Sequence, residues 1–122
     1  MMYKFTFRGL KMLAIAMPFE EYAKVDTGSV GQFFTPEGAV TVNKKYLGIP
    51  LLVFDAERMT IELVRHEVWH MAMWSSMTGT TTSLTTEDSE EIGAEIFAYF
   101  SRDLIKLSDT LYKELTKTKE KK

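Results

Sequence analysis

The chain has 122 residues, a formal net charge of −2 and 45% hydrophobic residues, which suits one small globular domain with a real core. The near-neutral charge gives no indication of a nucleic-acid partner or of an anionic membrane surface. The absence of cysteine excludes disulfides, thiolate zinc sites and thiol nucleophiles, so any bound metal must be held by His, Asp or Glu.

The N-terminal part of the chain predicts two strands and a short helix. Residues 3–7 alternate apolar and polar side chains, and residues 11–17 are apolar, so both segments favour strands. Pro18 marks a boundary, and residues 19–25 favour a short helix. The apolar run at 10–19 faintly resembles a signal peptide, but it is short and no small-residue cleavage site follows. No stretch is long enough to span a bilayer, and we expect a cytoplasmic protein.

Further strands are expected in the middle of the chain. Residues 32–35 favour an extended segment, and Pro36-Glu37-Gly38 predicts a turn after it. Residues 39–44 alternate valine with polar residues and therefore predict another strand. The apolar residues 51–54, which follow a Gly-Ile-Pro sequence, predict a short buried strand.

Two long helices are predicted in the second half. Asp55 or Thr60 is expected to cap the first helix, which runs to about Ser75. The polar segment from Thr78 to Thr86 predicts a loop, either a flap that covers a substrate or a solvated connector. The second helix is expected from Glu90 to about Lys117, since acidic residues fill its first turn and lysines its last.

These elements together predict an α+β fold. A small, mostly antiparallel sheet is expected to pack against the two long helices. Residues 1–116 form a single domain in this interpretation, and residues 117–122 form a disordered tail.

Both histidines of the chain lie in one short motif, His66-Glu67-Val68-Trp69-His70. Helical positions i and i+4 share a face, so the two imidazoles can bind one Zn²⁺ through ring nitrogens. Glu67 stands where a carboxylate can take a proton from a metal-bound water. The residue types and their spacing therefore indicate a zinc hydrolase.

The surroundings of the motif favour a helix with the histidines on its inward face. Met59, Leu63, Trp74 and Met77 share the 3–4 spacing of the two histidines and form an apolar stripe with them. Short motifs also occur by chance. The alternative is a core helix with two histidines that are satisfied within the protein.

A catalytic zinc usually has three protein ligands and one open position. The chain has no third histidine, so the remaining ligand is expected to be a carboxylate on the following helix. Glu91 and Glu95 lie on one helical face, one as a ligand and the other as a hydrogen-bond partner of a ligand histidine. Glu95 leads into the apolar residues 96–100, which predicts that it faces inward. The alternative is an acidic, solvated start of the helix.

Two segments together resemble a known family: His66-Glu67-x-x-His70 and Glu95-Ile-Phe-Ala-Tyr99-Phe are similar to the motifs of the gluzincins. Gluzincins are zinc metallopeptidases in which a helical glutamate follows HExxH. Within them the chain is most similar to minimal metallopeptidases encoded by phages and prophages, over roughly residues 40–106. The resemblance implies His66 and His70 as zinc ligands and Glu67 as catalytic base.

The same resemblance leaves the third ligand open. The Glu-x-Phe-Ala-Tyr pattern implies Glu95. The Glu-x-x-x-Asp pattern of other gluzincins, and the Glu-x-x-Ala-Asn-x-Phe-Ala pattern of the antirepressor-cleaving peptidases, imply Glu91. In both of these the second position is Asp or Asn, whereas this chain has glutamate there.

The function expected from the sequence is zinc-dependent hydrolysis of a peptide bond in a peptide or protein substrate. Tyr99 is the candidate for stabilising the developing oxyanion, with Tyr46 and Arg102 as further candidates by residue type. One alternative is a catalytically silent zincin-like protein that binds a partner and keeps a structural zinc. Another is a structural protein without metal. No nucleic-acid or membrane partner is expected.

Overall fold

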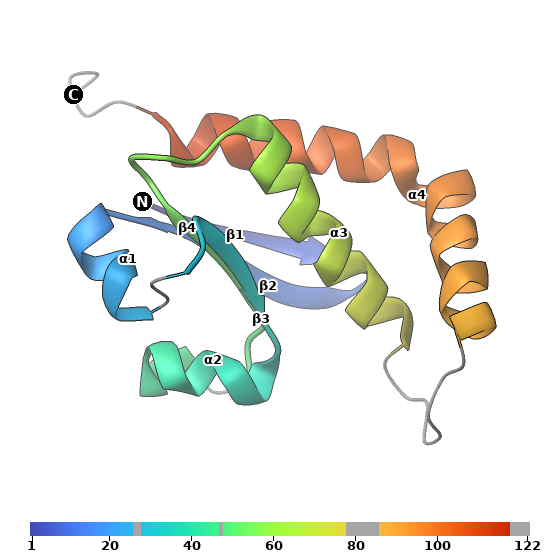
Figure 1. Cartoon of the computed structure of the whole chain (residues 1–122), viewed down its shortest axis with the longest axis horizontal. Helices are drawn as coiled ribbons and strands as arrows, with labels where there is room; N and C mark the ends of the chain where they lie inside the picture. The colour runs from blue at the N-terminus through green and yellow to red at the C-terminus, as the bar shows by residue number, and fades with distance from the viewer. Residues whose placement is uncertain (26–27, 47, 78–85, 118–122) are drawn as a thin grey trace.

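The computed structural model describes residues 1–25, 28–46, 48–77 and 86–117 (Figure 1). In chain order the elements are β1 (Met2–Phe7), β2 (Leu10–Met17), α1 (Phe19–Val25), β3 (Gly31–Phe34), α2 (Pro36–Val42), the 3-10 helix η1 (Lys44–Tyr46), β4 (Leu51–Asp55), α3 (Ile61–Met77) and α4 (Thr86–Leu115). Within these described ranges, none of the helices combines the length and apolar character needed to cross a membrane.

The four strands form one mixed sheet in the order β1-β2-β4-β3. The β1–β2 and β3–β4 pairs are antiparallel, whereas β2 and β4 are parallel. The β1–β2 hairpin turns through Arg8 and Gly9, whose φ angles of 52° and 82° suit a two-residue turn. The parallel pair needs a crossover, which α1, β3 and α2 provide. The predicted α+β class is confirmed, with antiparallel pairing in two of the three strand pairs.

The sheet is buried on both faces. Side chains alternate along β4, so that Leu52 and Phe54 join the cluster under α3 and α4, while Leu51 and Val53 join the cluster under α1 and α2. All five residues of β4 are buried. Figure 1 shows the two long helices together on one side of the sheet. The motif helix therefore packs over the edge strand β3 and the buried central strand β4.

The segment after β3 is a helix, so the turn predicted at 36–38 and the strand predicted at 39–44 are wrong. The side chain of Thr35 accepts a hydrogen bond from the backbone N–H of Gly38 at 3.4 Å and caps α2. Pro36 occupies the start of the helix, where its fixed φ is favourable and its missing N–H costs nothing. These start signals outweigh the strand-like alternation of valines that follows.

The other predicted elements agree with the structure to within a few residues. The strands predicted at 3–7, 11–17, 32–35 and 51–54 correspond to β1, β2, β3 and β4, and the short helix at 19–25 is α1. The apolar run at 10–19 contains β2. The second long helix begins earlier than expected, at Thr86. The polar segment predicted as a loop falls almost entirely outside the described residues, and so does most of the predicted tail.

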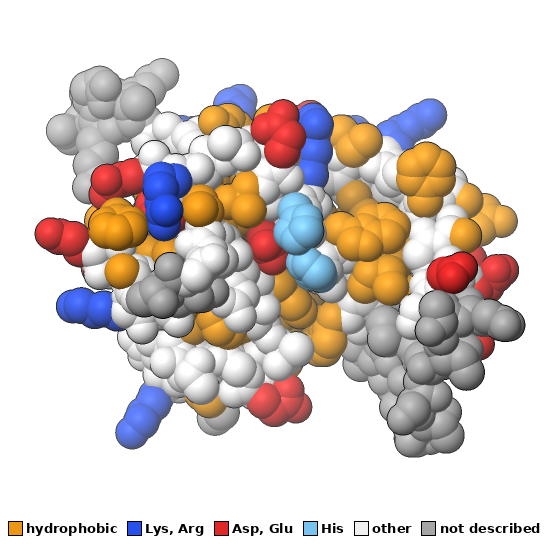
Figure 2. Space-filling view, in the orientation of Figure 1, with side chains coloured by type: hydrophobic (Ala, Val, Ile, Leu, Met, Phe, Trp, Pro, Cys, Tyr) orange, Lys and Arg blue, Asp and Glu red, His pale blue; other side chains and the backbone are white. Residues whose placement is uncertain are grey.

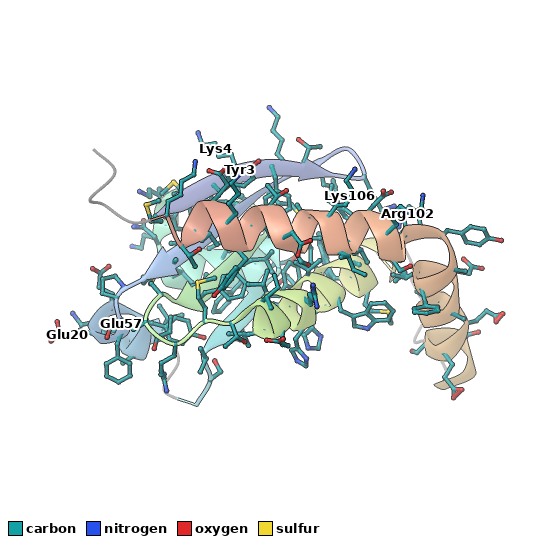
Figure 3. The ribbon with its side chains drawn as sticks, turned by 90° about the horizontal axis from the view of Figure 1, so that it is seen from above. Tyr3, Lys4, Glu20, Glu57, Arg102 and Lys106 are labelled. Carbon is teal, nitrogen blue, oxygen red and sulfur yellow. The ribbon has the colours of Figure 1, made fainter. Side chains whose placement is uncertain are left out.

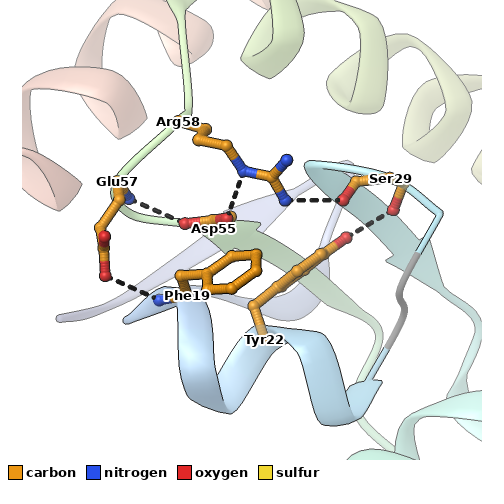
Figure 4. A network of polar contacts seen from close by, with 6 residues as sticks. All are labelled: Phe19, Tyr22, Ser29, Asp55, Glu57 and Arg58. Carbon is orange, nitrogen blue, oxygen red and sulfur yellow. Dashed lines mark hydrogen bonds and ion pairs between the residues drawn. The ribbon is translucent and has the colours of Figure 1, made fainter.

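A polar network fixes the start of β3 against the connection from β4 to α3 (Figure 4). The fully buried carboxylate of Asp55 accepts hydrogen bonds from the Arg58 Nε at 2.7 Å and from the Glu57 backbone N–H at 2.9 Å. Arg58 also reaches the carbonyl oxygen of Ser29 at 3.5 Å, and the hydroxyls of Ser29 and Tyr22 lie 2.7 Å apart. The network therefore ties the segment just before β3 to the segment that leads into α3.

Candidate metal centre

The motif lies in the middle of a well-capped helix. The Thr60 Oγ accepts the backbone N–H of Leu63 at 3.2 Å, and its carbonyl accepts that of Val64 at 3.1 Å. No glycine or proline interrupts α3. The face of α3 that meets the sheet is fully buried at Val64 and Val68. Helix geometry therefore fixes how the motif side chains lie relative to one another.

Both histidines are exposed, and their ring nitrogens almost meet. The Nε2 atoms of His66 and His70 lie 3.1 Å apart, and the rings stand edge to face. Figure 2 shows them, in pale blue, at the surface in the middle of the viewed face. The prediction of an inward histidine face is wrong, because the core face of α3 is rotated away from that stripe. The buried residues of α3 are Val64, Glu67, Val68, Met71 and Ala72.

The separation of the two nitrogens suits a shared metal ion. A separation of 3.1 Å is short enough for both nitrogens to reach one zinc ion at zinc–nitrogen bond lengths of about 2.0–2.1 Å. The same distance also suits a hydrogen bond between two neutral imidazoles, one donating and one accepting. The pair is therefore arranged to hold either one cation or one proton.

Glu67 is buried beside the histidines, with 7% of its surface exposed. Burial raises the pKa of the Glu67 carboxyl above its usual range. The charges of His70 and His66 and a hydrogen bond from the Phe33 backbone lower the pKa in part. The outcome is a carboxyl with enhanced proton affinity, held by the edge of the sheet next to the two ring nitrogens.

A hollow of about 460 Å³ opens between α3 and β3 and contains Glu67 and His70. The ring centroids of Trp74 and Phe33, which both line it, lie 5.7 Å apart. The remaining lining comes entirely from residues 29–35, which sequence reasoning did not connect with the site. No pattern in the sequence indicates this contact, because it depends on the pairing of β3 with β4.

The structure does not bring the two predicted glutamates to the histidines. Glu91 and Glu95 are exposed, so the prediction that Glu95 faces inward is wrong. Glu95 lines a small hollow with Arg8 and Ser76, on the side of the β1–β2 turn. Within residues 1–25, 28–46, 48–77 and 86–117, no group of three or more His, Cys, Asp or Glu side chains is placed to hold a metal.

The three candidates for oxyanion stabilisation also lie apart from the hollow at Glu67. Tyr99 is 79% exposed, and none of the three residues lines that hollow. Tyr46 belongs to the hydrophobic cluster on the opposite face of the sheet. Figure 3 shows Arg102 and Lys106 on the side of α4 away from α3. The candidate site therefore consists of His66, Glu67 and His70, with Phe33 and Trp74 lining the hollow beside them.

Comparisons of the chain with family models, with curated proteins and with solved structures found no match. The interpretation of this site therefore rests on its own residues and their geometry.

Proposed function

We propose that the chain hydrolyses peptide bonds with the help of zinc, with His66 and His70 as metal ligands and Glu67 as general base. The observation that carries this proposal is a pair of exposed histidines with Nε2 atoms 3.1 Å apart, both of which interact electrostatically with the buried carboxyl of Glu67. The resemblance of the two sequence motifs to the gluzincins supports the same chemistry.

Zn²⁺ bound at the histidines would polarise a substrate carbonyl and lower the pKa of a water molecule. Glu67 then contributes by accepting a proton at its carboxylate. Burial raises the pKa of this carboxyl, which improves its match to a proton acceptor working near neutral pH. The Phe33 backbone N–H orients the carboxylate, so the base is held in place before substrate arrives.

A peptide substrate fits the surroundings of Glu67. β3 lies at the edge of the sheet and pairs with β4 on one side only. Its residues line the hollow that contains Glu67 and His70. An extended peptide can add backbone hydrogen bonds along such an edge, which supports a peptide over a compact small molecule.

The proposal requires a third ligand, and Glu95 or Glu91 remains the candidate. Figure 1 shows α4 bent, with its N-terminal arm, in orange, turned away from the long C-terminal arm. Within residues 88–100 only Ile96 is fully buried, with Ile92 and Phe100 partly packed against the core, so fewer buried side chains hold this arm than hold the C-terminal arm. We infer that the arm reorients when metal binds and brings one carboxylate to the histidines.

The direct test is cleavage of a diverse peptide library, with products identified by mass spectrometry. Protein loaded with zinc is expected to cleave a subset of peptides, and the same protein treated with a chelator is expected to cleave none. Restoring zinc should restore the same products. Cleavage that persists unchanged in the chelated protein would contradict the proposal.

A second candidate function is a silent zincin-like protein that binds a partner around a structural zinc. It is favoured by one observation: the described residues place no carboxylate beside the two histidines as a third metal ligand. The Glu67→Gln variant separates the two functions, because a binding protein has no need of a proton acceptor and keeps its partner affinity. Zinc-loaded protein that cleaves nothing in the library would favour this candidate.

A further inference from the structure

A cavity of about 950 Å³ lies on the face of the sheet opposite the histidine motif. Among its lining residues, Ile15 and Tyr46 belong to the hydrophobic cluster under α1 and α2, and Met17 and Val42 pack against that cluster. The cavity shares no lining residue with the hollow between α3 and β3. It is therefore a second concave site, separate from the candidate metal centre.

The size and the walls of the cavity suit a whole small molecule with an apolar body. Sites for such molecules usually measure about 300–1,000 Å³. The walls include Met1, Met2 and Met17, and the first two are 50% and 52% exposed. Methionine side chains are unbranched and adapt to the shape of what they contact. A bound apolar body would remove their apolar surface from water.

One buried side chain of the lining has an unused hydrogen-bonding group. Tyr46 is only 8% exposed. Among the described residues its hydroxyl makes no hydrogen bond, whereas every fully buried side-chain nitrogen or oxygen there has a partner. The hydroxyl therefore lies at an accessible surface, and the cavity is the hollow that Tyr46 lines. A phenol of this kind can donate one hydrogen bond to a ligand.

The ionic groups of the lining favour neither an anion nor a cation. Glu21 and Lys24 carry opposite charges, stand three residues apart on α1 and are both exposed. The Met1 amino group donates to the Ala16 carbonyl oxygen at 3.2 Å. An ion of either sign meets a like charge here, and ion pairs exposed to water are weak. An uncharged molecule enters the apolar part of the cavity without the loss of hydration that a charge would suffer.

We propose that this cavity binds an uncharged small organic molecule that has an apolar body and an oxygen acceptor, and that the Tyr46 hydroxyl opens into the cavity and donates to that acceptor. A ligand without an acceptor would cover the phenol and leave its O–H group unpaired, which is unfavourable. The acceptor therefore provides selectivity, and the apolar walls provide affinity. This inference goes beyond the proposed function and does not rest on it.

The fluorescent molecule prodan is a suitable probe. It is an uncharged naphthalene that carries a ketone, and its emission moves to longer wavelength when the ketone accepts a hydrogen bond. Prodan at a low, fixed concentration is titrated with the protein, and an affinity on the order of 100 µM is expected for a molecule of this size. Zinc-loaded and chelated protein should give the same affinity. The matching naphthalene with a carboxylate in place of the ketone should bind at least threefold more weakly.

Two variants assign the binding to the cavity, each with a control. Tyr46→Phe should weaken prodan binding by about 2–10-fold and move the emission of bound prodan to shorter wavelength. Thr41→Trp fills the cavity from an exposed position on α2 and should abolish binding. Tyr3→Phe, in the cluster on the other face of the sheet, and Glu37→Trp, exposed on α2 outside the lining, should both behave like wild type.

The outcomes separate this inference from the proposed function. Protein that does not bind prodan, or Thr41→Trp that binds it as wild type does, overturns the cavity as a site. Tyr46→Phe with unchanged affinity and emission overturns the hydrogen bond, and it remains decisive if Thr41→Trp folds poorly because it removes a single oxygen. Tighter binding of the carboxylate overturns the uncharged ligand class. Zinc content is measured on every sample, and wild type that binds prodan but no zinc keeps the cavity and overturns the proposed function.

Discussion

Two pairs of residues have the same four-residue spacing, but the fold brings the side chains of only one pair together. His66 and His70 on α3 bring their Nε2 atoms to 3.1 Å from each other. Glu91 and Glu95 on α4 lie on an exposed face, and Glu95 lines a small hollow with Arg8 and Ser76. The spacing decides which residues share a helical face. It does not decide whether that face packs against another element or faces solvent.

The packing of the N-terminal arm of α4 explains the difference. Ile96 is buried, and a Cβ added at Gly93 would lie 3.6 Å from the Trp69 ring, so these residues set the rotation of the helix against α3. With them directed inward, Glu91 and Glu95 turn outward. The histidine pair needs no such agreement between two helices, because both side chains belong to one.

Replacing Glu67 tests the site on α3 and should give the largest effect on the rate of hydrolysis. Glu67→Gln should keep zinc and the fold but lose hydrolysis by about 10²–10⁴-fold, because the amide cannot accept a proton. The measurement is the rate of cleavage of a peptide found in the library, with zinc content confirmed for both proteins. A mutant rate equal to that of wild type would refute the assignment of Glu67 as base.

The α4 side is tested by removing each glutamate in turn. If Glu95 becomes the third ligand after the arm reorients, Glu95→Gln loses stoichiometric zinc, and Glu91→Gln weakens zinc affinity by about 10–100-fold. Zinc titration with a competing chelator measures both. Asp103→Asn is a matched control, since Asp103 is an exposed carboxylate further along the same helix. Affinities close to wild type in both glutamate variants would show that neither carboxylate reaches the metal.

A smaller effect is expected in the pH dependence of the metal-free protein. Burial raises the pKa of the Glu67 carboxyl in the folded state above its value of about 4.5 in the unfolded chain. The folded state therefore binds this proton more strongly, and the stabilisation is present at low pH and lost as pH rises through the folded pKa. Relative to Glu67→Gln, wild type should lose melting temperature as pH rises over the range above about 4.5. A constant difference across that range would contradict the buried environment.

Local patterns predicted those parts of the molecule that depend on neighbouring residues in the chain. The strands predicted at 3–7, 11–17, 32–35 and 51–54 and the helix that carries His66 and His70 follow from the pattern of apolar residues and correspond to β1, β2, β3, β4 and α3. Residues 36–42 form a helix in place of the predicted turn and strand, because the helix-start signal of Thr35 and Pro36 outweighs the valine alternation. The chemistry expected at the motif stays a prediction until metal is measured.

Contacts between residues far apart in the chain do not follow from these local patterns. The contact of Phe33 with Glu67 arises from the pairing of β3 with β4 and from the network around Asp55. The outward turn of Glu95 depends on which residues of α4 pack against α3 and the sheet. The Phe33–Glu67 contact and the orientation of Glu95 both depend on how the whole core packs. The periodicity of apolar residues in one helix therefore does not predict them.

The central claim is that His66 and His70 share a metal ion, and metal content tests it most directly. Elemental analysis of protein purified without chelators and reconstituted with zinc should find one zinc ion per chain in wild type. His66→Ala, prepared in the same way and shown to be folded, should contain none, because the loss of one ligand removes most of the affinity. Wild type without zinc, or His66→Ala with as much zinc as wild type, would contradict the account.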